Sequence, residues 1–314
     1  MSIATTSQKV AGTQPATVRL SARRREAIAG YLFVLPDALG LLLFIGLPMI
    51  LALVISLFEV DGFGNFTFVG LANYARMWGD ALFWQSLKVT LLFAVMLVPL
   101  LYVFGLGLAL LVQRNGRFNT VMRAMFFAPQ MVSLVVVALV WQLMVVDKLG
   151  IITRLLYSVG LGSVSLLGNP NFALFTVTGA CVWFLMGFYM LIFLGGLQDI
   201  PKEHYEAAKI DGAGRVQSFW YITLPLLRPT SFFVLLVSAV AAVAGAQAFD
   251  LVYVMTRGGP ANSTALFINY IYQQAFQYSA FGYAAALATL LVVVLMAITV
   301  VFFFLTRGGR FQYE

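Results

Sequence analysis

The residues best suited to a specific interaction lie together in one polar segment, 197–229. A carboxylate at Glu206 is followed directly by the small side chains of Ala207 and Ala208. Small side chains allow another backbone to approach closely, and a lone carboxylate can pair with a basic residue of a partner. The segment also carries large apolar side chains of the kind that anchor protein interfaces, namely Ile210, Phe219, Trp220 and Tyr221. The composition therefore predicts docking to another protein.

Helix start and stop signals in this segment predict the element that presents the carboxylate. Pro201 suits the first turn of a helix, Glu203 favours the positive end of its dipole, and Gly212 can adopt the left-handed conformation that ends it. About three helical turns fit between these signals. Residues 215–221 can form a second, shorter helical stretch before a proline interrupts it. We expect a helix, a turn and a helix outside the hydrocarbon.

Residues for catalysis or metal binding form no pattern. The single histidine, His204, has no second ligand nearby, and Cys181 is the single cysteine. A phosphate-binding loop needs Gly-x-x-x-x-Gly-Lys-Ser/Thr after a strand, and no segment fits it. We therefore expect no enzymatic activity, no bound metal and no cofactor in this chain.

The elements that must position the polar segment are membrane helices. The chain is 61% hydrophobic and 10% charged, whereas a soluble domain is about 25% charged. A helix needs about 20 apolar residues to cross the hydrocarbon core. Six stretches meet this requirement: 38–58, 89–112, 124–145, 172–194, 231–249 and 281–305. The sequence predicts an all-α polytopic membrane protein, with the polar segment between its fourth and fifth spans.

The distribution of basic residues predicts the orientation of these spans. Most of the 19 Lys and Arg fall in the segments that share a side with the N-terminus, so both termini are expected in the cytoplasm. Residues 1–22 are expected to form a disordered cytoplasmic tail, and residues 23–314 one membrane domain. Residues 31–37 fit either an extension of the first span or a helix at the membrane interface.

A few polar and aromatic side chains within the spans could line a path for a solute. An amide at Gln247 could bind a hydroxylated solute, but it could equally hydrogen-bond a neighbouring helix. Sugar rings stack on aromatic side chains, although aromatic residues in membrane proteins more often serve packing or the interfacial belt. The remaining candidates are Trp141, Gln142, Trp183 and Tyr189. The spans contain no Lys or Arg, which disfavours a strongly anionic solute at the midplane.

The polar segment resembles a known signature. Glu206-Ala207-Ala208, three residues, Gly212, nine residues, Ile222, one residue and Leu224-Pro225 are similar to the cytoplasmic signature of binding-protein-dependent ABC importer permeases. The resemblance implies a coupling helix that sits in a groove of the ATP-hydrolysing subunit. An ordinary solvated loop helix is the alternative. The residues assigned to coupling by this resemblance are Glu206, Ala207, Ala208, Asp211, Gly212, Ile222, Leu224 and Pro225.

Three further stretches, 31–36, 68–74 and 249–260, resemble the larger permease subunit of the carbohydrate branch of that family. This resemblance implies a sugar or sugar-like solute, with glycerol-phosphate-type or other polyol solutes as the alternative. It also implies partners: a second permease subunit that forms a heterodimer with this chain, two ATP-binding subunits that hold ATP and Mg, and an extracytoplasmic solute-binding protein. The expected location is the bacterial cytoplasmic (inner) membrane. The chain is expected to contact membrane lipid and to bind no nucleic acid.

Two other classes of membrane protein fit less well. An ion-coupled secondary transporter would carry charged residues inside its spans, and here only Asp37 and Asp250 lie near span ends. A membrane enzyme would need clustered polar groups at one membrane face, and none is apparent. The sequence therefore favours a permease that depends on partner subunits.

Overall fold

The structure, a computed structural model, describes residues 17–60, 64–160, 165–245 and 247–305. The chain divides into two compact units, Met1–Val54 and Ile55–Glu314. Among the described residues, four helices are long and apolar enough to cross a membrane, or up to six if each of two bent helix pairs is one span. This agrees with a mostly helical polytopic architecture of four to six membrane helices.

The N-terminal unit is helical throughout its described residues. Helix α1 (Thr17–Leu41) continues through a π-helical turn (Leu42–Gly46) into α2 (Leu47–Ile55), and Glu26–Ile55 forms one apolar run of 30 residues. Such a run is about 45 Å long, which exceeds the hydrocarbon thickness. Residues 31–37 are therefore part of a continuous helix.

Two predictions for this region need correction. The predicted first span, 38–58, ends too late, because Phe58 belongs to strand β1 (Phe58–Val60), which pairs antiparallel with β2 (Phe66–Phe68). Aromatic and β-branched residues favour strands, and the two segments meet across a short connection. Of the predicted disordered tail, residues 17–22 lie in helix α1, whose Arg, Leu and Ala residues are good helix formers. Residues 1–16 lie outside the described residues.

Long helices form the body of the C-terminal unit. Helix α4 (Ala81–Val112) packs along α8 (Pro170–Gln198), and their contact buries large side chains such as Phe93, Met190 and Phe193. Helix α15 (Phe281–Leu305) lies beside α12 (Arg228–Ala244). Helices α4, α8 and α15 contain the predicted spans 89–112, 172–194 and 281–305, so these predictions are confirmed as continuous helices.

The predicted third span, 124–145, is not straight. Helix α5 (Arg117–Phe127) leads through a 3₁₀ turn (Ala128–Met131) to α6 (Leu134–Met144), and the two parts meet at 98°. Val132 and Ser133 are extended, since their ψ angles are 144° and 133°, and this breaks the helical hydrogen-bond ladder. The Gln130 side chain donates a hydrogen bond to the carbonyl of Phe184 on α8 at 3.0 Å, which holds the break against the core.

The predicted fifth span, 231–249, is also shorter than expected. Helix α12 ends at Gly245, whose φ of +67° is left-handed, and a separate helix, α13 (Phe249–Met255), follows. A Cβ at Gly245 would lie 2.6 Å from Cγ2 of Ile268, so this position also needs a small residue for the close approach of α14 (Phe267–Tyr272). The predicted span therefore runs past a true helix end.

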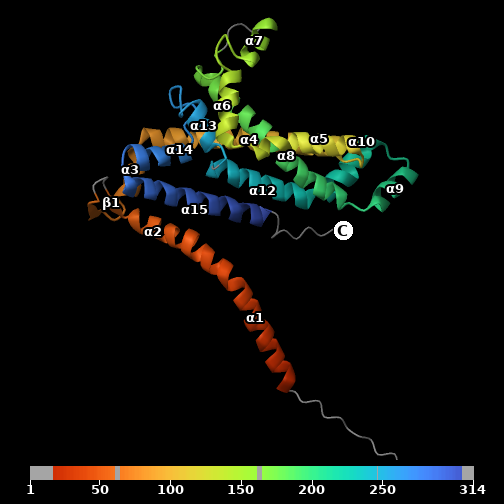
Figure 1. The fold of residues 1–314 in the computed structure, drawn as a ribbon, viewed down its shortest axis with the longest axis horizontal. Coiled ribbons are helices and arrows are strands. Elements are labelled where there is room, and N and C mark those ends of the chain that lie inside the picture. Colours follow the sequence, from red (N-terminus) through yellow and green to blue (C-terminus); the bar gives the residue numbers. More distant parts are fainter. Residues whose placement is uncertain (1–16, 61–63, 161–164, 246, 306–314) are drawn as a thin grey trace, which may run out of the picture. The chain divides into compact units, whose positions relative to one another are not determined.

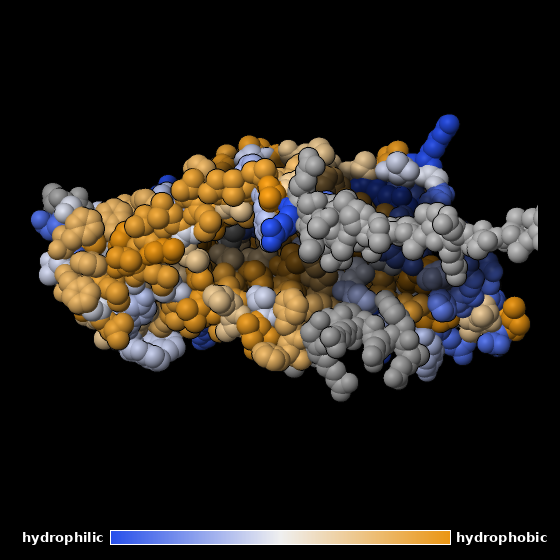
Figure 2. All heavy atoms as spheres, turned by 90° about the horizontal axis from the view of Figure 1, so that it is seen from below, coloured by the Kyte–Doolittle hydropathy of each residue, from blue (hydrophilic) through white to orange (hydrophobic). Residues whose placement is uncertain are grey.

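Short elements gather at the two ends of the long helices (Figure 1). Helices α9 (Lys202–Ile210) and α10 (Arg215–Ser218) lie at one end, followed by a π turn (Phe219–Thr223) and α11 (Leu224–Leu226). At the other end lie α3 (Ala72–Gly79) and α14, which continues into a π turn (Gln273–Gln277). Helix α7 (Ile151–Ser158) follows α6. In Figure 2 hydrophobic side chains cover much of the face shown, and hydrophilic ones gather at the end where Figure 1 places α9 and α10.

Candidate coupling segment and solute sites

Helix α9 is the element that sequence signals predicted, and its end has a defined geometry. Gly212 has a φ of +79°, and the amides of Gly212 and Ala213 donate to the carbonyls of Lys209 and Ala208 at 3.1 and 2.8 Å. These two bonds form a Schellman motif, which requires a left-handed residue. No atom lies within 4 Å of a Cβ built at Gly212, so the need for glycine is conformational rather than steric. Pro201 occupies the N-cap of α9, one position before the predicted first turn.

A pair of hydroxyls joins α9 to the chain that enters α12. The Tyr205 hydroxyl and Thr223 Oγ1 lie 3.0 Å apart, and Thr223 Oγ1 also donates to the carbonyl of Ser218 at 3.3 Å. Thr223 is buried, and the Tyr205 ring packs against the main core. Sequence reasoning missed this pair, because nothing in the spacing of two isolated polar residues indicates that they meet. The pair therefore links α9 directly to the π turn that precedes α11 and α12.

The outer surface of this segment is open. Glu206 and Ala207 are exposed, and the side chains of Ile210 and Tyr221 are 87% and 81% exposed. The structure brings some of the predicted coupling residues around one shallow hollow of about 400 Å³, lined by Ala208, Asp211, Gly212, Ala213, Gln217, Ser218, Tyr221 and Ile222. Leu224 and Pro225 lie in α11 and are half-buried, away from this hollow.

The predicted solute candidates fall into different environments. The rings of Trp141 on α6 and Trp183 on α8 meet edge to face at a centroid distance of 6.0 Å, and Gln142 beside them is half-buried. Tyr189 is 2% exposed and contacts Phe188, so within this chain it is a packing residue. Gln247 is exposed and follows the end of α12 rather than lying inside a span. The structure thus brings Trp141 and Trp183 together, leaves Gln142 as the sequence neighbour of Trp141, and buries Tyr189.

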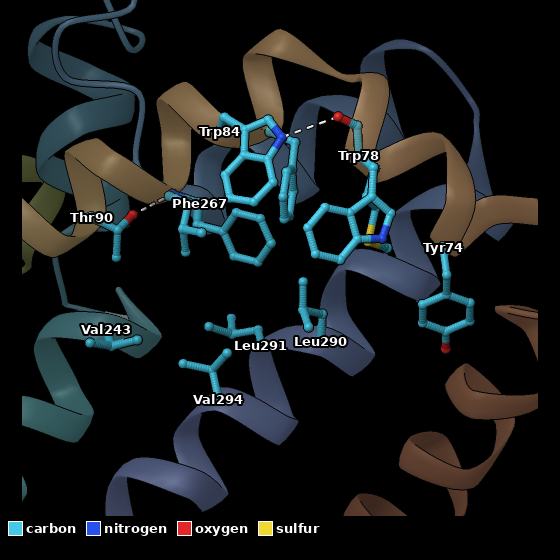
Figure 3. Close-up of a pocket in the computed structure, with 12 residues that line it drawn as sticks. Tyr74, Trp78, Trp84, Thr90, Val243, Phe267, Leu290, Leu291 and Val294 are labelled. Carbon is cyan, nitrogen blue, oxygen red and sulfur yellow. Dashed lines mark hydrogen bonds between the residues drawn. The ribbon is translucent and has the colours of Figure 1, made fainter. Parts of the chain in front are cut away.

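A hollow of about 330 Å³ between α3, α4, α12, α14 and α15 has the wrong chemistry for a hydroxylated solute (Figure 3). Its walls are mainly aromatic and aliphatic. The hydroxyl oxygen of Thr90 already accepts a hydrogen bond from the amide of Phe267 at 2.8 Å, and the Trp84 indole donates to the carbonyl of Trp78 at 3.2 Å. Its polar groups are therefore committed, and the hollow fits hydrocarbon.

A carboxylate network fixes the start of α4. Asp80 Oδ1 caps the helix by accepting from the amides of Leu82 and Phe83 at 2.9 and 3.3 Å. Its Oδ2 accepts from the hydroxyls of Tyr270 and Tyr283, the second at 2.6 Å. Burial alone raises the pKa of Asp80, but the hydrogen bonds from Tyr270, Tyr283 and the two amides outweigh burial and lower it below its usual value. The network ties α4 to α14 and α15.

Metal-binding geometry is absent from the part of the chain that the structure describes, since no three His, Cys, Asp or Glu side chains are grouped there. His204 is exposed on α9.

Comparison with known proteins gives this arrangement a family. The model of the family described as "Binding-protein-dependent transport system inner membrane component" matches residues 101–307, which include α9 and its connections. A probable ABC transporter permease protein of Bacillus subtilis, YesP, is 37% identical over 285 residues, covering 89% of this chain and 91% of YesP. The trehalose/maltose transport system permease protein MalF of Thermococcus litoralis is 35% identical over 291 residues, covering 92% and 96%.

A solved structure shows the same fold. A chain of a bacterial alginate ABC transporter, crystallised with an alginate-bound periplasmic protein, superposes with a TM-score of 0.80 at 21% identity, covering 92% of this chain and 97% of that one. The family model, the relatives and the fold agree. The chain belongs to the family of inner membrane components of binding-protein-dependent transport systems.

Proposed function

We propose that this chain is the permease subunit of an ATP-driven importer that moves a sugar or sugar-like solute across the cytoplasmic membrane. Relatives that are 33% to 35% identical are named as permeases for lactose and for trehalose/maltose. The observation that carries the proposal is the exposure of Glu206 and Ala207 on α9, a helix that the Tyr205–Thr223 contact links to the turn leading into α11 and α12. A solvated loop helix would need neither an open apolar surface nor such a link.

The proposed assembly contains four kinds of chain. A second, distinct permease subunit pairs with this one, two ATP-binding subunits hold ATP and Mg, and an extracytoplasmic binding protein presents the solute. In this arrangement the chain has six spans, if each bent helix pair crosses the membrane once, and both termini are cytoplasmic. The segment 197–229 then faces the ATP-binding subunits.

Coupling follows from the geometry of that segment. When the ATP-binding subunits close, the partner groove displaces α9. Because Tyr205 contacts Thr223 in the turn that precedes α12, the displacement reaches α12 within a few residues. The 66° bend between Arg215–Leu226 and Arg228–Ala244 converts a movement along the membrane surface into a tilt of α12. Access to the solute path then alternates between the two membrane faces.

The proposal is tested by reconstituting the complex with its binding protein in liposomes and measuring uptake of radiolabelled maltose, trehalose, lactose and sn-glycerol 3-phosphate. Uptake of a saccharide that requires ATP and the ATP-binding subunits is expected. Uptake of sn-glycerol 3-phosphate alone would favour the alternative solute class, since a relative named for that solute is 34% identical. Uptake driven by an ion gradient, without the ATP-binding subunits, would refute the proposal.

A further inference from the structure

Four aromatic rings from α13 and the segment of α14 with its π turn form one cluster. Phe249 stacks on Tyr253 with 5.6 Å between ring centroids and 14° between planes. Tyr272 meets both of these rings edge-on, at 5.2 and 5.5 Å, and Phe276 contacts Tyr272 at 5.0 Å. None of the sequence-based solute candidates is a member of this aromatic cluster.

Two of the four rings in the aromatic cluster are exposed and the other two are half-buried, unlike the tyrosines of the core. Tyr253 is 39% exposed and Phe276 69% exposed, whereas the core tyrosines Tyr189 and Tyr283 are each 2% exposed. Packing alone would be served better by burial, because burying an aromatic ring removes a large apolar area from water. An exposed stack of rings instead offers flat faces to a ligand.

Polar groups suited to hydroxyls accompany the rings. Two members of the aromatic cluster, Tyr253 and Tyr272, each carry a phenol hydroxyl. Asn269 is buried beneath it, where its side-chain amide donates to the carbonyl of Phe249 at 3.5 Å and its Oδ1 has no hydrogen-bond partner among the described residues. The exposed amide of Gln247 lies two positions before Phe249 in the chain. Aromatic faces with amides and hydroxyls nearby match the surface of a sugar ring.

The position of the aromatic cluster also suits a solute on its way through the protein. Helix α12 separates it from the coupling segment by 17 residues, or about 25 Å. Helix α13 packs against α6, which carries Trp141 and Gln142. The aromatic cluster therefore lies at the opposite end of α12 from α9, next to the helix that holds the predicted solute candidates (Figure 1).

We propose that the aromatic cluster of Phe249, Tyr253, Tyr272 and Phe276 is a binding site for a pyranose or furanose ring that enters from the side opposite the coupling segment. The C–H face of the sugar stacks on the exposed rings, and its hydroxyls bond the tyrosine hydroxyls and the Gln247 amide. The inference rests on the proposed function and narrows it: glycerol phosphate has no ring to stack, so the site selects cyclic sugars.

The test measures uptake kinetics of the reconstituted complex with its binding protein, with radiolabelled maltose, trehalose and lactose as probes. Tyr253→Leu removes a ring and Tyr253→Phe removes the hydroxyl alone. Phe276→Leu is a second ring variant whose exposed position tolerates substitution. Tyr278→Leu is the matched control, because Tyr278 is 63% exposed in the same region and makes no ring contact within the described chain.

Loss of one ring is expected to raise KM for the transported saccharide about three- to tenfold, and Tyr253→Phe to raise it less. ATP turnover at saturating solute and membrane abundance should match the wild type. If both ring variants keep KM within about twofold of wild type, or if Tyr278→Leu raises KM as much as they do, the site is refuted. Failure of the wild-type complex to import any of the three saccharides would overturn the proposed function as well, so the two failures are distinguishable.

Discussion

Charge reversal at Glu206 separates the proposed docking role of α9 from its contribution to folding. Glu206 is exposed and forms no ion pair within the described chain, so Glu206→Lys breaks no internal contact. The new lysine would lie one turn from Lys202 and Lys209 on the same helix. Two such like-charge neighbours cost about 1 kcal/mol or less in helix stability. The local cost is too small to unfold a domain whose core lies elsewhere.

The cost at a partner surface is much larger. Breaking the pair between a carboxylate and a basic residue in a desolvated groove costs about 2 to 5 kcal/mol of binding free energy, and a lysine in place of the carboxylate adds repulsion between like charges. This cost corresponds to a rise in the dissociation constant for docking of between about 30-fold and several thousand-fold. We therefore expect Glu206→Lys to abolish transport while the chain stays in the membrane at normal abundance.

The assay uses the complex with its binding protein, and it measures solute uptake together with the stimulation of ATP hydrolysis by loaded binding protein. Glu203→Lys is the matched control, since Glu203 is also exposed and lies on the first turn of the same helix. Glu206→Lys should lose both activities, and Glu203→Lys should keep most of each. Normal uptake and stimulation in Glu206→Lys would show that α9 is not the coupling helix. Equal losses in the two variants would point to the general charge of the segment instead of a specific pair.

Three further outcomes follow from single features of the structure. Gly212→Ala should lower uptake less than Gly212→Val. The space at the Cβ is empty but φ is +79°, and the left-handed conformation costs about 1 kcal/mol for alanine and more for a β-branched residue. Equal uptake in both variants would contradict the conformational role of Gly212. Asp80→Asn should keep the helix cap but weaken the bonds from Tyr270 and Tyr283, so the detergent-solubilised chain should melt at a lower temperature at pH 7. Folding lowers the pKa of Asp80, so the ionised carboxylate stabilises the fold above the unfolded value of 3.8, and this stabilisation is lost as the pH falls below that value. The difference in melting temperature between the wild type and Asp80→Asn should therefore vanish in acid. A difference that does not change with pH would refute the role of the carboxylate. In a Cys181→Ser background, His204→Cys should be shielded from an impermeant thiol reagent in intact cells, whereas Asn262→Cys should react. The reverse labelling pattern would overturn the expected topology with cytoplasmic termini.

The sequence alone determined the class of protein, the family resemblance and the course of the coupling segment. Long apolar runs are local properties, so α8 and α15 could be predicted within a few residues, whereas α4 begins eight residues before the predicted start at 89. The same holds for α9, because its proline, its first-turn carboxylate and Gly212 each act on the neighbouring backbone. Where one residue's conformational preference decides the local structure, prediction succeeded.

Only the tertiary structure decided where apolar runs break. Length and hydropathy do not distinguish a straight span from α5 and α6 meeting at 98°, since the bent pair taken together is long and apolar enough to be a span. The break depends on Gln130 reaching a carbonyl of α8, a contact 54 residues away in sequence. The Tyr205–Thr223 pair and the four-ring aromatic cluster likewise join segments that the sequence keeps apart. Such contacts form when packing brings distant segments together, and no local pattern of residues indicates which distant segments will meet.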